Sequence, residues 1–183
     1  MPEKTLSNCI WETRKIRINT EQRLLKYLNI SDWLIPWVSA NLIIINLIPN
    51  NSSNQYISIF TIYLSILILI VSIILNSKQF GVRASNMKAH YIELSNLLFK
   101  IKSDEKKITE YNNEYNKLLN QIENHSEIDY LKAVISLEND DDSTMKKPTL
   151  RNKIYYYFRN IVFYFLIACL FILPIIPIIV LLK

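Results

Sequence analysis

The sequence predicts an all-α integral membrane protein with an N-terminal transmembrane hairpin, a cytosolic helical hairpin and a C-terminal third transmembrane helix. Two runs without a charged residue carry this prediction: 45 residues at 33–77 and 23 residues at 160–182. A helix needs about 20 mostly apolar residues to cross a bilayer. The 183 residues also include a single Gly, which leaves little room for the tight turns of a β-fold.

Residues 1–32 are predicted to form a cytosolic amphipathic N-terminal helix. Five of its residues recur at helical spacing, with basic residues between them: Ile10, Trp11, Arg14, Ile18 and Leu25. Two placements fit this pattern. The helix either lies on an anionic inner leaflet, or it packs on the rest of the cytosolic part. Ser31 and Asp32 are predicted to form the N-cap of the first span.

Residues 33–77 are predicted to form the transmembrane hairpin, with spans at about 33–49 and 56–76. The stretch at 49–55 is polar and lies where the turn between two spans is needed. The alternative is a buried helical hairpin in a soluble core. A domain of this size seldom buries so long an uncharged run beside a large charged segment, so the membrane hairpin is favoured.

Residues 78–154 are predicted to form the cytosolic helical region. Apolar residues keep to steps of three and four through 78–103, so the second span is expected to continue into the cytosol as one long helix. The pattern restarts over 105–124, and a short helix follows at about 127–137. The two longer helices should form an antiparallel hairpin or coiled coil with their charged faces outward. An acidic loop is expected at 138–143.

Residues 155–183 are predicted to form the C-terminal transmembrane helix, which spans about 159–182. Pro174 and Pro177 should kink its outer half. Lys and Arg residues flank one end of each span. By the positive-inside rule they place the N-terminus and residues 78–154 in the cytoplasm and the C-terminus outside.

No catalytic residue, metal site or cofactor is predicted. A single Gly cannot build a glycine-rich phosphate loop. Cys9 has no identifiable general base, and Cys169 lies within a predicted span. Glu123, His125 and Asp129 lack a further His or Cys ligand and do not share one helix face. Residues 78–154 carry a net charge of only +1, so no direct nucleic-acid binding is expected.

Polar residues of the membrane hairpin are the candidate functional surface. Five of them fall within about 60° of one face of the second span. In the first span, Ser39 and Asn46 share a face because they are seven residues apart. This polar stripe either packs helices together or lines a conductive path. Both interpretations require a homo-oligomer, because three helices cannot enclose a pore. The stripe comprises Ser39, Asn46, Ser58, Thr61, Ser65, Ser72 and Asn76.

A segment at 115–130 has the pattern YxxLLxxxENHxxxDY, which follows the hairpin and a long helix. Together with residues 80–88 and the order of the predicted elements, it resembles the SLATT families, the two-transmembrane effector domains associated with bacterial conflict systems. The subgroup often encoded beside reverse transcriptases is the most similar. The residues that carry this cytosolic motif are Tyr115, Leu118, Leu119, Glu123, Asn124, His125, Asp129 and Tyr130.

The resemblance implies a pore-forming antiviral effector of the bacterial inner membrane, where perforation leads to cell death or dormancy and limits phage spread. It also implies an activator protein, either a reverse transcriptase or a nucleotide-signalling enzyme. The alternatives are a non-conducting anchor or adaptor and a regulatory subunit that tethers a defence enzyme. No catalytic role follows for the cytosolic motif. It is either a hydrogen-bonded helix junction or a docking surface for the activator.

Overall fold

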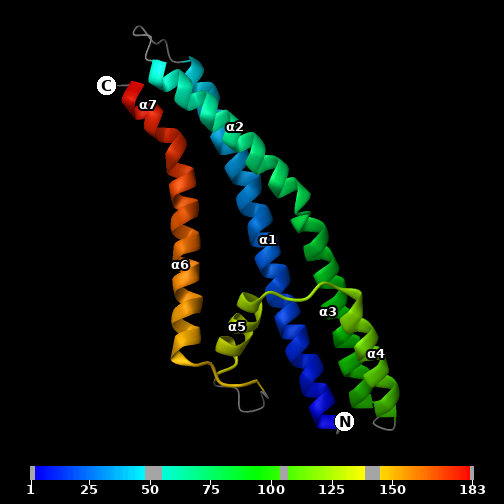
Figure 1. The fold of residues 1–183 in the computed structure, drawn as a ribbon. Helices are drawn as coiled ribbons and strands as arrows, with labels where there is room; N and C mark the ends of the chain where they lie inside the picture. The colour runs from blue at the N-terminus through cyan, green and yellow to red at the C-terminus, as the bar shows by residue number, and fades with distance from the viewer. Residues whose placement is uncertain (1–2, 48–54, 104–106, 139–144, 182–183) are drawn as a thin grey trace. The chain divides into compact units, whose positions relative to one another are not determined.

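The computed structural model describes residues 3–47, 55–103, 107–138 and 145–181, and all their regular secondary structure is helical (Figure 1). Three stretches of these residues are long and apolar enough to cross a membrane: Leu6–Leu47, Ser58–Ser103 and Leu150–Ile179. The predicted all-α membrane class is therefore confirmed. The predicted polar turn at 49–55 and acidic loop at 138–143 lie almost entirely outside the described residues.

The helices follow one another in the order α1 (Glu3–Leu47), α2 (Gln55–Ser77), α3 (Phe80–Ser103), α4 (Ile108–Gln121), α5 (Glu127–Ser136), α6 (Leu150–Ile172), the 3-10 turn η2 (Leu173–Ile175) and α7 (Ile176–Leu181). They form two compact units. The first unit comprises Met1–Leu25 and Gly81–Phe158, and the second comprises Lys26–Phe80 and Arg159–Lys183. The helices α1 and α6 each contribute to both.

Helix α1 is continuous over 45 residues, which corresponds to about 67 Å. The predicted N-cap at Ser31 and Asp32 is therefore wrong. Ser31 lies inside the helix, and its hydroxyl donates to the carbonyl of Tyr27 at 2.7 Å. The change from charged to uncharged sequence marks a change of surroundings, and a helix can cross such a boundary without a break.

Helices α2 and α3 are separate, so the prediction of one long helix through residue 103 is also wrong. The chain turns at Lys78 and Gln79, and Gln79 has a φ of 47°. This left-handed conformation cannot belong to an α-helix. The apolar spacing on both sides of the turn is helical, which is why the pattern gave no sign of it.

The first unit contains the predicted antiparallel hairpin, formed by α3 and α4. Lys100 pairs with Glu114, and ten residues earlier on α3 His90 contacts the carbonyl of Leu118. The N-terminal part of α1 completes its core with Leu6 and Ile10, which are fully buried. The other members of this core are Leu94, Leu97, Ile101, Tyr111 and Leu118. Of the two placements open for residues 1–32, the structure shows packing on α3 and α4 for the part of α1 that belongs to this unit, residues 3–25.

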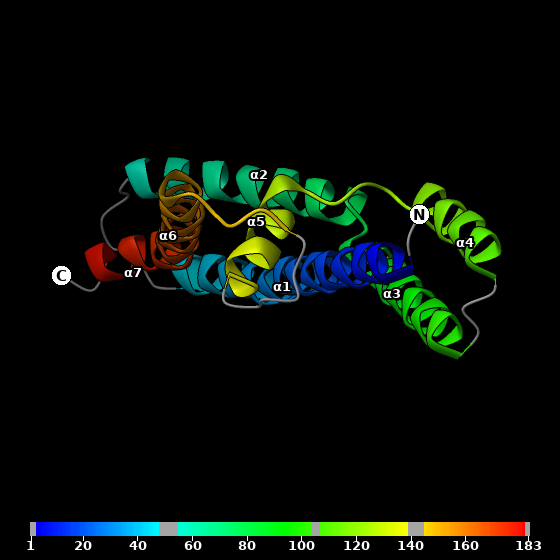
Figure 2. The same ribbon diagram turned by 90° about the horizontal axis from the view of Figure 1, so that it is seen from below.

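Helix α5 is short and lies against α1 in both views (Figure 1 and Figure 2). Its buried residues are Ile128, Asp129, Leu131, Ala133 and Val134. Ser126 is its N-cap. Helix α4 ends at Gln121, and Asn124 lies in the connection between α4 and α5.

Helix α6 begins at Leu150, five residues before the predicted C-terminal segment. The α-helical pattern changes to a 3-10 turn at Leu173–Ile175, which includes Pro174, and resumes in α7. Pro174 has no N–H to donate and so interrupts the α-helical hydrogen bonds. The α-helix is thus interrupted at Pro174, one of the two prolines at which the sequence predicts a kink, whereas Pro177 lies within α7.

Candidate functional site

In the second unit, α2 packs on α1 through one apolar face. Leu64 of α2 lies in a core with Leu34, Val38 and Leu42 of α1, and Phe60 and Ile68 pack against this core. These α2 residues recur every four positions, as expected for a single helix face. Most of the remaining circumference of α2 is exposed.

The polar stripe of α2 runs along the margin of this packing face. Its centre is about 95° around the helix from the centre of the apolar contact. Thr61, at the near edge, is buried, and Ser72 is half-buried. Ser58, Ser65 and Asn76 are exposed. The stripe residues of α2 lie along one side of this helix, and among the described residues no helix covers most of them.

The hydroxyl groups of the stripe donate to carbonyls of their own helix. Thr61 donates to Ser58 at 2.9 Å, Ser65 to Thr61 at 2.7 Å and Ser72 to Ile68 at 2.6 Å. Such bonds satisfy the donors without a partner from another helix. The hydroxyl oxygens retain a free acceptor position, so the stripe remains able to contact water or a neighbouring polar group.

The polar residues of the first span are bonded in the same way. Ser39 donates to Ile35 at 2.9 Å, and Asn46 donates to Leu42 at 2.8 Å. Asn41, which does not share their face, donates to Trp37 at 2.8 Å and is buried. Ser39 is half-buried and Asn46 is exposed. The stripe of α1 is therefore less continuous than that of α2.

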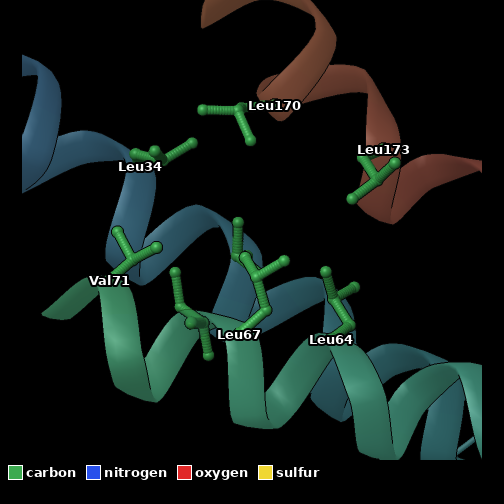
Figure 3. A pocket seen from close by; sticks show the side chains of 8 residues that line it. Leu34, Leu64, Leu67, Val71, Leu170 and Leu173 are labelled. Atoms are coloured by element: carbon green, nitrogen blue, oxygen red, sulfur yellow. The ribbon is translucent and has the colours of Figure 1, made fainter.

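A small cavity of about 30 Å³ lies where α1, α2 and α6 meet. Figure 3 shows Leu34, Leu64 and Leu170 directed toward this space from the three helices. Its lining is wholly apolar: Leu34, Val38, Leu64, Leu67, Ile68, Val71, Leu170 and Leu173. A water molecule needs polar partners that these side chains do not offer. The cavity is a packing gap and provides no chemistry.

An aromatic layer joins three segments of the second unit. Tyr27 of α1 contacts Phe80 and Phe163, with ring centroids 5.6 and 5.4 Å apart. Lys26 places its ammonium 4.7 Å from the ring centre of Phe163 and 3.9 Å from that of Tyr164. These are cation–π distances. The sequence offered no sign of this layer, because its members lie far apart along the chain.

A second contact fixes the register of α1 against α6. The indole of Trp37 donates to the carbonyl of Phe171 at 2.9 Å, close to the turn where Pro174 supplies no N–H. Trp37 lies about 15 Å further along α1 than Tyr27, and Phe171 lies about 12 Å further along α6 than Phe163. The two helices are therefore parallel neighbours. In this register the charge-free run of α6 starts about 13 Å before that of α1.

In the first unit, hydrogen bonds join the cytosolic motif to α1. Asp129 is only 2% exposed, and its carboxylate accepts from Arg23, Thr20 and Ser126. The distances are 2.8 Å from Arg23 Nε, 3.0 Å from the Thr20 hydroxyl and 2.8 Å from the Ser126 hydroxyl. Asn19 also donates to the backbone carbonyl of Asp129 at 3.3 Å. One carboxylate thus joins α1 to the start of α5.

Two side chains, of His90 and Arg17, hold the last turn of α4 and the connection that follows it. His90 Nε2 lies 2.7 Å from the carbonyl of Leu118, which is in the last turn of α4, and must donate to it. Arg17 donates to the carbonyl of Glu123, in the connection after α4. The last carbonyls of a helix lack intrahelical donors and carry partial negative charge. His90 supplies one of these missing donors, and Arg17 holds the connection that follows the helix.

The remaining residues of the cytosolic motif have different surroundings. The Tyr115 hydroxyl is 2.7 Å from that of Thr13, and the Glu123 carboxylate pairs with Arg83 at 2.7 Å. The rings of His125 and Tyr130 stack at 6.3 Å. Leu118 is buried, Leu119 is half-buried and Asn124 is exposed. Most of the motif therefore faces the fold, and the exposed parts are at Glu123 and Asn124.

The partners of the motif on α1 were missed by the sequence analysis, which attributed the basic residues there to membrane topology. They are Thr13, Arg17, Asn19, Thr20 and Arg23. Their spacing of three or four residues along a helix was the available signal. Without knowledge of which helix lay opposite, that signal could not be paired with the motif.

Burial and charge shift the pKa values of these groups in different directions. Burial by itself raises the pKa of Asp129, but hydrogen bonds and charge from Arg23, with Ser126 and Thr20, bring it below its usual value. Burial lowers the pKa of His90, and the charge of Arg17 lowers it further. Burial also lowers the pKa of His125. Asp129 is therefore a carboxylate, and both histidines favour the neutral form.

The described residues hold no group of three or more His, Cys, Asp or Glu side chains that could bind a metal ion. Burial raises the pKa of the Cys9 thiol, which disfavours the nucleophilic thiolate. His90 and Asp129 are occupied by structural hydrogen bonds. The contacts in this part of the chain are those of a helix junction.

Comparison with known proteins identifies the family. Residues 1–182 match the model of the SMODS and SLOG-associating 2TM effector domain family 5, so the chain belongs to this SLATT family. No curated protein and no solved structure matches it significantly. The family is described as an effector domain with two transmembrane segments, whereas the described residues here provide three candidate spans.

Proposed function

We propose that this chain is a conflict-system effector that oligomerises in the bacterial inner membrane and perforates or depolarises it when its cytosolic helices are engaged. The family description supports a membrane effector. The observation that carries the finer proposal is the polar stripe of α2, which lies beside the packing face and is mostly exposed. Polar groups in a bilayer favour protein or water over lipid.

Self-association would cover this stripe. Helices in membranes associate through small and hydroxylated residues, and Ser58, Ser65 and Ser72 provide such a surface. A ring of copies could instead turn the same residues toward a central path. Uncharged hydroxyl and amide groups would line it without strong ion selectivity, because they form neither a charged ring nor a carbonyl filter.

The proposed orientation places the N-terminus and residues 78–154 in the cytoplasm and the C-terminus outside. The distribution of Lys and Arg supports it. The first unit, with its mixed charges, then meets the activator, for which a reverse transcriptase or a nucleotide-signalling enzyme remains the proposed class. Within the cytosolic motif, Glu123 and Asn124 are exposed and so available to such a partner.

The proposed route of activation runs through α1. The turn at Gln79 separates α2 from α3, whereas α1 continues without interruption from Glu3 to Leu47. Arg17, Thr20 and Arg23 on this helix hold the cytosolic motif. A partner that changes these contacts would act directly on the helix that forms the first span.

A non-conducting anchor, adaptor or regulatory subunit is the second candidate. It is favoured by the hydrogen bonds of Thr61, Ser65 and Ser72 to their own helix. Since these donors are already satisfied, the stripe can lie against another helix or against lipid without lining water. An unrelated pair of spans could then replace the hairpin with no loss of function.

Induced expression with a membrane-potential dye and a membrane-impermeant dye separates the two candidates. Ser65→Leu and Ser72→Leu should abolish depolarisation and dye uptake while the protein remains in the membrane fraction. Ile66→Leu and Ile73→Leu are matched controls, because both residues are exposed but lie off the stripe. Depolarisation that persists in both serine variants would rule out a lining role for the stripe.

A further inference from the structure

The outward face of α3 has a charge-free strip at its centre. Its members follow one another in alternating steps of three and four residues, and all are exposed: Val82, Ser85, Ala89, Ile92, Asn96 and Phe99. Phe99 is 75% exposed, Val82 58% and Ile92 46%. Alternation of three and four is the spacing of the a and d positions of a coiled coil. We call this strip the α3 seam.

The opposite face of α3 is already used inside the first unit. Its buried residues are Ala84, Met87, His90, Leu94, Leu97 and Ile101. An ordinary surface helix is apolar on one side and charged on the other. Helix α3 instead has apolar residues on two opposite sides, and the described residues cover only one of these sides.

The charged residues of the outward face flank the seam. With Val82, Ala89 and Asn96 at a positions, Lys88 falls at g and Glu93 at e. In a parallel pair of helices, a g residue lies next to the e residue that follows it by five positions on the partner. Lys88 of each copy would therefore meet Glu93 of the other. Neither side chain forms an ion pair within the described residues.

We propose that the α3 seam binds the same seam of a second copy of this chain, as a parallel two-stranded coiled-coil contact. In an antiparallel pair that overlaps along the whole seam, g positions face g positions, so Lys88 would meet Ser95 and gain no ion pair. Asn96 at an a position favours one register, because its amide is satisfied only opposite its counterpart. This contact rests on the self-association in the proposed function and assigns it a cytosolic surface distinct from the membrane stripe.

Disulfide cross-linking of the full chain in native membranes tests the contact. In a Cys9→Ala and Cys169→Ala background, Ile92→Cys should give a linked dimer under mild oxidation, because facing d positions lie within disulfide reach. Asn116→Cys is the matched control, since it is exposed on α4 of the same unit. We expect a yield at least about fivefold higher for Ile92→Cys than for the control. Equal yields would overturn the proposal.

Charge exchange tests the parallel register. In the Ile92→Cys background, Lys88→Glu alone and Glu93→Lys alone should each lower the dimer yield, because like charges then face each other. The double variant Lys88→Glu, Glu93→Lys should restore it. A double variant that cross-links no better than either single variant would overturn the parallel pairing of these two residues.

Measuring both cross-linking and depolarisation in cells that express the Ile92→Cys variant distinguishes the α3 contact from the pore. Cross-linking through Ile92→Cys without depolarisation would refute perforation and leave the α3 contact standing. Depolarisation without cross-linking would refute the α3 contact alone. Phe99→Glu places a charge in the seam at a fully outward position and should lower the dimer yield without loss of the protein from the membrane fraction.

Discussion

Arg23 and Asp129 are joined by two parallel hydrogen bonds, of 2.8 Å from Nε to Oδ1 and 2.9 Å from Nη2 to Oδ2. Bidentate pairs of this kind fix both distance and angle. Thr20 and Ser126 occupy further acceptor positions of the same carboxylate. The pair therefore sets how α1 meets the start of α5.

Replacing Arg23 tests how much this pair contributes to the stability of the fold. Arg23→Ala leaves the buried Asp129 carboxylate without its charge partner, so we expect a loss of about 3 kcal/mol in stability. In detergent, this should appear as a lower melting temperature. Arg83→Ala is the control. It removes an exposed pair with Glu123 and should cost at most about 1 kcal/mol. Equal effects of the two substitutions would contradict the assigned importance of Asp129.

Acid should weaken the first unit through His90. Burial lowers the pKa of His90 below the usual 6.5, so below about pH 6.5 the unfolded chain binds a proton that the folded chain does not. Stability is therefore full above that pH and falls as the pH drops toward the folded pKa, by at most about 1.4 kcal/mol per pH unit. Asp129 has a lowered pKa, so its contribution is lost only at more acidic pH, below about 3.9.

His90→Gln isolates this effect, because the amide can still donate to the Leu118 carbonyl but does not titrate. The difference in melting temperature between pH 7.5 and pH 5.5 should be smaller for the variant than for the natural chain. The same pH difference in melting temperature is measured for His125→Gln, because burial lowers the pKa of His125 as well. An unchanged pH difference in His90→Gln would show that His90 does not titrate in this range.

Gln79 offers a backbone test. Its φ of 47° is unfavourable for a residue with a Cβ but not for glycine. Gln79→Gly should therefore stabilise the chain by up to about 1 kcal/mol, whereas Gln79→Ala should not. Melting temperatures of the two variants in the same detergent measure the difference. A lower melting temperature for Gln79→Gly would argue against the turn between α2 and α3.

The register of α1 against α6 predicts where the third span enters the bilayer. Lys26 packs on Tyr164, so these residues lie at one depth, although the sequence places Tyr164 well inside the span. In inverted membrane vesicles and a Cys9→Ala background, Tyr164→Cys should react with an impermeant maleimide while Cys169 does not. Lys26→Cys should react as Tyr164→Cys does. Protection of Tyr164→Cys to the level of Cys169 would contradict this register.

The sequence was sufficient for the helices and the membrane spans, because both depend on composition and local spacing. The long uncharged runs predicted the spans, and the 3.6-residue periodicity predicted α3, α4 and α5. The two errors, at Ser31 and Gln79, concern whether consecutive helices join. Apolar spacing does not encode that choice, since a single turn at Lys78 and Gln79 decides it.

The candidate site was predictable only in part. The position of the α2 stripe on one side of its helix follows from helix geometry alone, and its role stays a prediction. The partners of Asp129 come from a helix more than 100 residues earlier, and the contact depends on how α1 packs with α4 and α5. A single sequence shows charge and spacing, but it does not show which helices are neighbours.

Helix α1 contains one internal proline, Pro36. Its missing N–H removes a backbone bond, so the rod is more compliant there than elsewhere. Leu34 and Val38, which border the cavity, lie two residues to either side. Bending of α1 caused by a force on its N-terminal part would therefore concentrate between Leu34 and Val38, which pack α1 against α2. The cavity beside these two side chains leaves room for that bending.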